Sequence, residues 1–200
     1  ACNNTAIGYD SLKANTTGTQ NVAIGKDALL SNTTADDNTA VGYASLYANT
    51  TGQFNAAIGK LALCSNTTAS NNTALGNASL KSNTTGTANT GLGRSALSAN
   101  TDTSFNVAVG VDALKTNDAD ANTALGYVAL CSNTTGTTNV AVGRSALCKN
   151  TTASSNTAVG SNSLRANTTG ASNTSVGSSA LIANTTGTTN TAVGSSAGLS

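Results

Sequence analysis

Acidic side chains are the main acid–base groups of this chain. It holds eight acidic residues, all of them Asp, and no His. Hydrolysis of a glycosidic bond needs two carboxylates roughly 5–9.5 Å apart across a cleft. Asp10 and Asp27 lie at matching places in consecutive copies of a repeated phrase, but Lys13 and Lys26 flank them in a variable column. We therefore predict no catalytic residue and no enzymatic activity.

Two acidic pairs are candidates for a calcium site. The stretch "ADD" holds Asp36 and Asp37, and the stretch "DAD" holds Asp118 and Asp120. Calcium takes about six to eight oxygen ligands, and the Gly-rich nonapeptide of calcium-binding solenoids is absent from the sequence. We expect solvated loop charges here, with no metal ion and no cofactor.

The four cysteines offer redox chemistry. Cys64, Cys131 and Cys148 share one position of the repeat, and the last two belong to consecutive copies. If consecutive copies stack about 4.8 Å apart, Cys131 and Cys148 are a candidate disulfide. The alternative is three small residues in a column that tolerates many types. Cys2 and Cys64 have no evident partner in the chain, and no Cys-x-x-Cys pair indicates zinc.

Asn-Thr-Thr stretches are acceptor sequons for N-glycosylation in a secreted protein. They make Asn15, Asn32, Asn49 and Asn66 candidate glycan sites. The alternative is that the repeat needs these letters for a corner, since an Asn buried in a ladder cannot carry a sugar.

All of these residues belong to one repeat. Its copies begin at Asn4, Asn21, Asn38, Asn55, Asn72, Asn89, Asn106, Asn122, Asn139, Asn156, Asn173 and Asn190, a step of 17 residues with a single step of 16. A fixed period of this length is typical of a solenoid, in which each unit buries its apolar face against its neighbours. Residues 1–200 thus form one repeat array, which begins and ends in mid-phrase and which we expect to be a segment of a longer chain.

Composition excludes several functions. Charged residues are 8% of the chain, against roughly 25% in an ordinary soluble domain. A net charge of +1 and an aromatic content of 3% supply neither a basic stripe nor a stacking platform, so we expect no nucleic-acid partner. No run of apolar residues approaches the roughly 20 that a spanning helix needs, so we expect no membrane insertion within this segment.

The columns of the repeat, with its first Asn as position one, predict the local structure. Position four is always Ile, Val or Leu, position five is always Gly, and position nine is Leu in all copies but the last. Alternation along a strand predicts positions two and four inside and positions three and five outside. A run so short and rich in β-branched residues does not fit a helix. We predict an all-β parallel solenoid of about 17 residues per coil and 11–12 coils.

Position twelve predicts the corners. It is Asn in every copy that reaches it: Asn15, Asn32, Asn49, Asn66, Asn83, Asn100, Asn117, Asn133, Asn150, Asn167 and Asn184. Asn accepts left-handed backbone angles and bonds to nearby backbone. Stacked copies should also form an amide ladder, and so should the Asn of position one. The copy that begins at Asn106 lacks one residue, which predicts a tighter turn there.

The phrase "NVAIGKDAL", at positions one to nine, resembles the "SVAIG" type of repeat in the heads of trimeric autotransporter adhesins. This resemblance implies a parallel β-roll that assembles as a homotrimer on a bacterial surface. The stretch "NTAVGYASLYANTTG" is similar to repeat arrays of phage and viral tail fibres, and this second resemblance covers the whole chain. Arrays of that kind act as shafts or display surfaces.

We therefore expect a non-enzymatic, filament-forming shaft of an extracellular fibre, at a cell surface or on a virion. Its expected partners are copies of itself, end to end or as a homotrimer, and surface glycans. Small residues at positions three and five should let another rod pack closely. The alternative is an ice-binding or glycan-binding solenoid that uses stacked Thr and Asn columns, such as the one with Thr50 and Thr67. Asp102 and Asp118 interrupt those Thr columns, which weighs against ice.

Overall fold

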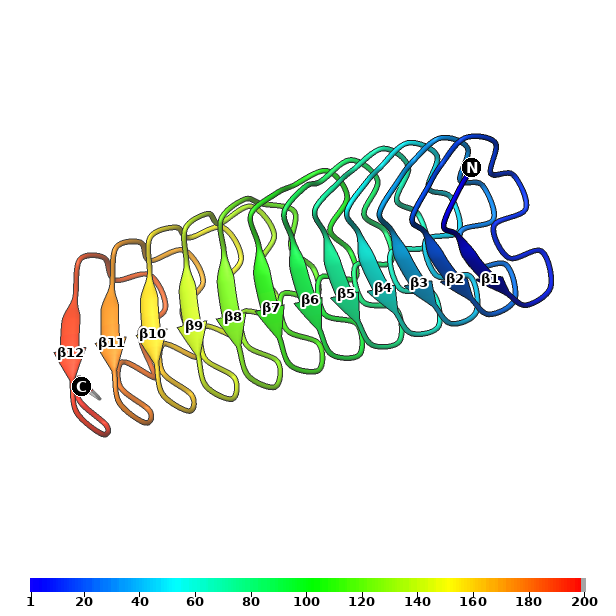
Figure 1. The fold of residues 1–200 in the computed structure, drawn as a ribbon. Helices are drawn as coiled ribbons and strands as arrows, with labels where there is room; N and C mark the ends of the chain where they lie inside the picture. Colours follow the sequence, from blue (N-terminus) through cyan, green and yellow to red (C-terminus); the bar gives the residue numbers. More distant parts are fainter. Residues whose placement is uncertain (199–200) are drawn as a thin grey trace.

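The computed structural model describes residues 1–198, which form twelve short strands in one parallel sheet. The strands are β1 (Thr5–Ile7), β2 (Val22–Ile24), β3 (Thr39–Val41), β4 (Ala56–Ile58), β5 (Thr73–Leu75), β6 (Thr90–Leu92), β7 (Val107–Val109), β8 (Thr123–Leu125), β9 (Val140–Val142), β10 (Thr157–Val159), β11 (Thr174–Val176) and β12 (Thr191–Val193). They lie side by side in the order of the sequence, and turns carry the chain round between them (Figure 1). The predicted parallel β-solenoid with one coil per repeat is confirmed.

The coils stack in register. Each strand residue pairs with the residue one repeat later, as Ala6 does with Ala23 and Ile7 does with Ile24. Backbone bonds continue past the strand, because Gly25 N–H donates to the carbonyl of Ile7 at 2.7 Å. Among the described residues there is no helix of the length and apolarity that crossing a membrane requires.

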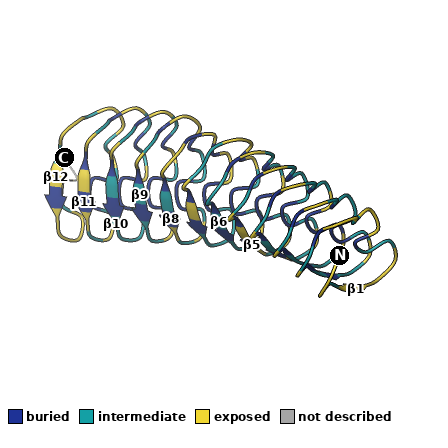
Figure 2. Ribbon diagram, turned by 45° about the horizontal axis from the view of Figure 1, so that its top comes forward, coloured by how far each residue is buried: buried dark blue, intermediate teal, exposed yellow. Residues whose placement is uncertain are grey.

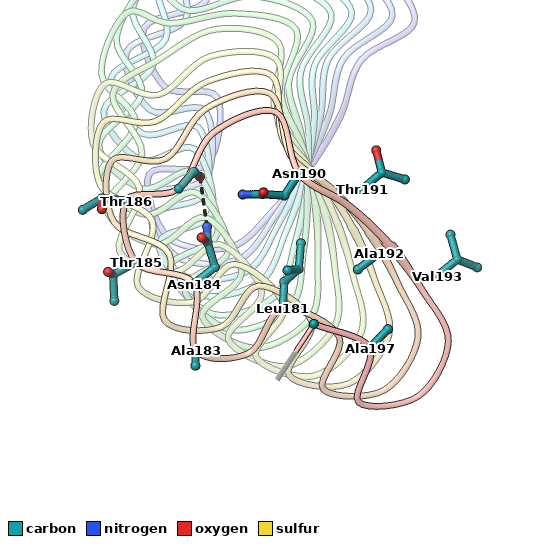
Figure 3. A pocket seen from close by; sticks show the side chains of 12 residues that line it. Leu181, Ala183, Asn184, Thr185, Thr186, Asn190, Thr191, Ala192, Val193 and Ala197 are labelled. Atoms are coloured by element: carbon teal, nitrogen blue, oxygen red, sulfur yellow. Dashed lines mark hydrogen bonds between the residues drawn. The ribbon is translucent and has the colours of Figure 1, made fainter. Parts of the chain in front are cut away.

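The predicted orientation of the strand residues is wrong. Position three points inside, where Ala23 and Ala57 are fully buried, while the position-four residues Ile7 and Ile58 are 59% and 42% exposed. Figure 3 shows the same arrangement in the last coil: Ala192 faces the interior, while Thr191 and Val193 point away from it. Buried and exposed positions alternate along the strands in Figure 2.

The size of the interior explains this orientation. The column of Leu at position nine is buried, as predicted, and Leu29, Leu46 and Leu63 are fully covered. Small residues of positions three and eight complete the core, including Ala23 and Ala28. Because Leu already fills the centre of a narrow coil, the strand that faces it has room only for a small residue, which is Ala in most coils. The predicted packing of another rod against the position-three Ala is therefore excluded.

The corners use left-handed backbone at positions other than the one predicted. The position-twelve Asn is not among the residues with positive φ, whereas Leu29 at position nine has φ of 49° and Asp27 at position seven has φ of 58°. Position five holds Gly because φ is about +130° there and because the next coil passes very close. A Cβ added to Gly25 would lie 2.7 Å from the carbonyl oxygen of Gly42. Position five thus requires Gly because its backbone packs closely against the next coil of the same chain.

Candidate functional site

The outward face of the sheet carries an apolar band along the whole solenoid. The band, here called the outer stripe, consists of the position-four residues Ile7, Ile24, Val41, Ile58, Leu75, Leu92, Val109, Leu125, Val142, Val159, Val176 and Val193. All of them are half-exposed or exposed, and Leu75 and Leu125 reach 48% and 46%. At about 4.8 Å per coil the outer stripe is roughly 50 Å long. Apolar patches of this extent mark interaction surfaces in soluble proteins.

Aromatic and basic side chains lie just beyond the strand, at position six. Tyr9, Tyr43 and Tyr127 are exposed there. Lys26 lies over the ring of Tyr9, with its Nζ 5.7 Å from the ring centroid, and Lys60 lies over Tyr43 at 5.9 Å. These cation–π contacts between neighbouring coils cover part of the rings of Tyr9 and Tyr43.

The position-twelve Asn residues form a side-chain ladder inside the solenoid. Asn49 Nδ2 donates to Oδ1 of Asn32 at 3.1 Å, and Asn66 Nδ2 donates to Oδ1 of Asn49 at 2.9 Å. Each amide also donates to a carbonyl of its own corner, as Asn49 does to Gly52 at 2.9 Å. Buried amides are costly unless they are hydrogen-bonded, so the ladder both needs and enforces the stacking of the coils.

The position-one Asn residues form a second ladder of a different kind. Oδ1 of Asn21 accepts the backbone N–H of Asn38 in the next coil at 3.0 Å. Nδ2 of Asn21 crosses the coil to the carbonyl of Ala35 at 2.8 Å. Asn32 Nδ2 also donates to that carbonyl, at 3.1 Å, so the two ladders meet at one oxygen in this coil.

The short coil interrupts the position-twelve ladder. Asn117 Nδ2 donates to the carbonyl of Ala119, two residues away, where the regular corners bond three residues away. Oδ1 of Asn100 accepts instead from the hydroxyl of Thr103. The ladder resumes at Asn133, whose Nδ2 donates to Oδ1 of Asn117 at 2.8 Å. The missing residue therefore tightens this corner, in line with the sequence, and removes one rung.

These ladders contradict the predicted glycan sites. Asn32, Asn49 and Asn66 are fully buried. In each of them Nδ2, the atom to which an N-linked sugar attaches, donates two hydrogen bonds. Asn15 is half-exposed, but its Nδ2 donates to the carbonyl of Gly18 at 3.0 Å. The folded coils thus bury three of the four amides and engage the fourth in a hydrogen bond, and the buried Asn side chains do not face ice or a glycan.

The two Thr columns differ in accessibility. At position thirteen, the hydroxyl of Thr50 donates to the carbonyl of Thr67 in the next coil at 3.1 Å, so it helps the coils to stack. At position fourteen, Thr51 and Thr68 are exposed. The Thr column open to a ligand is therefore one residue later than Thr50 and Thr67. Asp102 takes the place of Thr in that open column.

Four of the six candidate carboxylates for catalysis or calcium, those of Asp10, Asp36, Asp118 and Asp120, make contacts with other groups of the chain. Asp10 pairs with Lys13 at 3.1 Å on the surface. Asp36 Oδ1 accepts from the backbone N–H and the hydroxyl of Thr19, at 2.6 Å and 2.9 Å. In residues 1–198, no three His, Cys, Asp or Glu side chains gather as metal ligands would.

Position sixteen was missed in the sequence. There a side-chain oxygen accepts the backbone N–H of the preceding coil, as Ser70 Oγ does from Gln53 at 3.0 Å and Asp120 Oδ1 does from Ser104 at 2.7 Å. The signal in the sequence is the recurrence of Ser or Asp in this column. These oxygens hold coils together and do not form an open site.

Cys131 and Cys148 are brought together. Their Sγ atoms lie 3.1 Å apart, and both are free thiols. The hydrogen bond that Cys148 donates lowers the pKa of Cys131 below the ordinary thiol value, although burial opposes this. The same bond, with burial, raises the pKa of Cys148. Cys64 lies in the same column with Lys81 one coil later, and burial raises its thiol pKa. Cys2 is exposed and also free.

A hollow at the C-terminal end is lined by the columns that form the core elsewhere. Leu181, Asn184, Asn190, Ala192 and Ala197 are among its walls (Figure 3). It is the open cross-section of the last described coil.

Comparisons with protein-family models, with curated proteins and with solved structures found no match to this chain.

Proposed function

We propose that this chain is a structural shaft that assembles with copies of itself through the outer stripe. The observation that carries the proposal is the continuity of that stripe, from Ile7 to Val193, with an apolar residue in each coil. Burying half-exposed Ile, Leu and Val side chains contributes about 25 cal/mol per Å² of apolar surface. A second solenoid lying alongside would gain this energy at every coil.

The way in which the coils are joined supports a load-bearing role. Backbone bonds and two Asn ladders connect each coil to the next, so bending at one point strains several ordered bonds. No three potential metal-ligating side chains gather in residues 1–198, and the main buried polar groups are committed to the ladders. We place this shaft outside the cell, in a fibre at a cell surface or on a virion. The outer stripe joins its chains side by side as a homotrimer, and end-to-end joining of such trimers extends the filament, which accords with the resemblance to adhesin heads and tail fibres.

Charging the outer stripe tests the proposal. We expect the unmodified chain to elute as an oligomer in size-exclusion chromatography with light scattering. Ile58→Lys combined with Leu125→Lys should shift it at least tenfold toward the single chain, because two ammonium groups would be desolvated in the interface. Thr51→Lys combined with Thr68→Lys is the matched control, since it adds the same two charges in the exposed position-fourteen column, across the coil from the sheet.

Circular dichroism should show the fold unchanged in both variants, because all four positions are exposed. A wild-type chain that is monomeric at every concentration would contradict assembly through the outer stripe. Equal dissociation by the control variant with Lys at both Thr positions would also contradict it.

Ice or glycan binding is the second candidate, and one observation favours it: the position-fourteen Thr column is exposed, as at Thr51 and Thr68. Asp102 breaks this column, and a lattice-matching plane tolerates breaks badly. We expect no thermal hysteresis in a freezing assay. Clear hysteresis that disappears in Thr51→Tyr and Thr68→Tyr, and persists in the charged outer-stripe variant, would place ice binding ahead of the shaft.

A further inference from the structure

Cys131 and Cys148 form a thiol pair that the shaft does not require. Each occupies position ten of its coil, and the coils are consecutive, so the pair spans one coil step of about 4.8 Å, within the usual Cα separation of disulfides. Their Sγ atoms are 3.1 Å apart, against a disulfide bond of about 2.05 Å. The sulfurs therefore need to approach by only about 1 Å.

The contact between the two sulfurs favours a thiolate at Cys131, because Cys148 lies 3.1 Å away and donates a hydrogen bond to it. The neighbouring cations act on Cys148. Arg165 follows Cys148 in the position-ten column, and it acts with Lys149 to lower the pKa of Cys148 against the larger effects that raise it. Asp112 raises the pKa of Cys131, but Nζ of Lys115 lies 3.7 Å from that carboxylate. Cationic surroundings also attract anionic disulfides such as oxidised glutathione.

We propose that Cys131 and Cys148 are a redox modification site, at which exchange with a small aliphatic disulfide forms a reversible covalent link between two consecutive coils. Cys131 is the attacking thiol and Cys148 is the resolving thiol. The link closes a loop of a single coil directly after the short coil, where the position-twelve ladder has lost a rung. It therefore adds a covalent bond between the two coils that follow this interruption.

The exchange balances in two steps. The Cys131 thiolate attacks one sulfur of the small disulfide, whose S–S bond breaks and releases one thiolate. Cys148 loses its proton to solvent, and its sulfur attacks Cys131 Sγ in the mixed disulfide, which expels the second small thiolate. The two protein thiols are oxidised, one small disulfide is reduced to two thiols, and the two protons lost by the protein appear on those thiols.

Mass spectrometry tests the site in a chain that carries Cys2→Ser, which removes the exposed thiol and with it links between molecules. The reduced protein is incubated with oxidised glutathione, alkylated, denatured and digested with trypsin. Cleavage after Arg144 separates the two cysteines, so a disulfide appears as segment 116–144 joined to segment 145–149. We expect this linked pair to predominate, while Cys64 is recovered mostly alkylated.

Two variants distinguish the assigned roles of Cys131 and Cys148 from the effect of merely stacking two thiols in one column. Cys148→Ser keeps a hydroxyl donor beside Cys131 but removes the resolving thiol, so a stable glutathione adduct should accumulate on Cys131. Lys81→Cys places a second thiol one coil after Cys64, in the same column, and should create a new linked pair there if stacking at position ten is sufficient. A wild-type chain in which Cys131 and Cys148 are alkylated as completely as Cys64 would overturn the proposal. A persistent glutathione adduct on Cys131 with Cys148 present would do the same.

Discussion

Gly110→Ala should destabilise the solenoid by about 3–5 kcal/mol, the largest effect that we expect from a single methyl group. Gly110 has φ of 133°, a conformation that L side chains rarely adopt. An added Cβ would lie 2.5 Å from the carbonyl oxygen of Gly126 and 2.6 Å from its carbonyl carbon. These are backbone atoms, and Gly126 N–H donates to Val109 at 2.7 Å, so the coils cannot separate without losing their hydrogen bonds.

Gly194→Ala is the matched control for this substitution. Gly194 has a similar φ of 127°, but the nearest atom to its added Cβ is Cβ of Ala197, at 3.9 Å. It should therefore carry only the conformational cost of about 1–3 kcal/mol. Hydrogen exchange of amides in the coil concerned measures both losses locally, which matters in a repeat protein whose ends open first. If the two variants lose the same free energy of unfolding, the close approach of the coils at Gly110 does not add to the cost of the substitution.

Asn83→Leu should cost about 2–5 kcal/mol, because it removes a rung from a buried ladder while keeping the side-chain volume. Asn83 Nδ2 donates to Oδ1 of Asn66 at 3.0 Å and to Gly86 O at 2.9 Å, and its Oδ1 accepts from Asn100 at 2.9 Å. Leu leaves Oδ1 of Asn66 and one N–H of Asn100 unpaired in the core, whereas Gly86 O retains the bond from Asn72. Urea unfolding followed by circular dichroism measures the loss, and a cost under about 1 kcal/mol would show that the ladder does not stabilise the stack.

Asn83→Asp tests the polarity of the same rung. A buried carboxylate here would face two acceptors, Oδ1 of Asn66 and the carbonyl of Gly86, so the folded state should raise its pKa above the unfolded value of about 3.9. The loss of stability is then full above the folded-state pKa and disappears as the pH falls from that pKa toward the unfolded value. Asn83→Leu should show no such recovery, and parallel pH curves for the two variants would contradict the assigned donors and acceptors.

The solenoid fold and the buried column of Leu at position nine could be predicted from the sequence, because both follow from the regular repetition of the same residues. Which strand face turns inward could not, because alternation fixes the pattern of a strand but not its phase. Ile58 was assigned to the core for its size, whereas the narrow coil around Leu63 admits only Ala57 opposite it. The volume that the position-nine Leu leaves inside the coil decides which strand residue can point inward. This volume is known only once the three-dimensional path of the coil is known.

The candidate sites show the same limit. Counting along the repeat shows that Cys131 and Cys148 share one column. The distance of 3.1 Å between their Sγ atoms and the charges around them can be obtained only from the structure. The position-twelve Asn column was evident, but left-handed backbone occurs at Leu29 and Asp27 instead. Leu is a poor choice for that conformation by local preference, so stacking with the next coil must impose it.

Cryo-electron microscopy of the purified chain will show whether copies of this shaft assemble through the outer stripe. We expect particles in which the sheet faces of neighbouring solenoids lie against each other, with Ile58 and Leu75 covered and a rise of about 4.8 Å per coil. Single rods about 55 Å long, with the outer stripe facing solvent at all concentrations, would contradict this assembly.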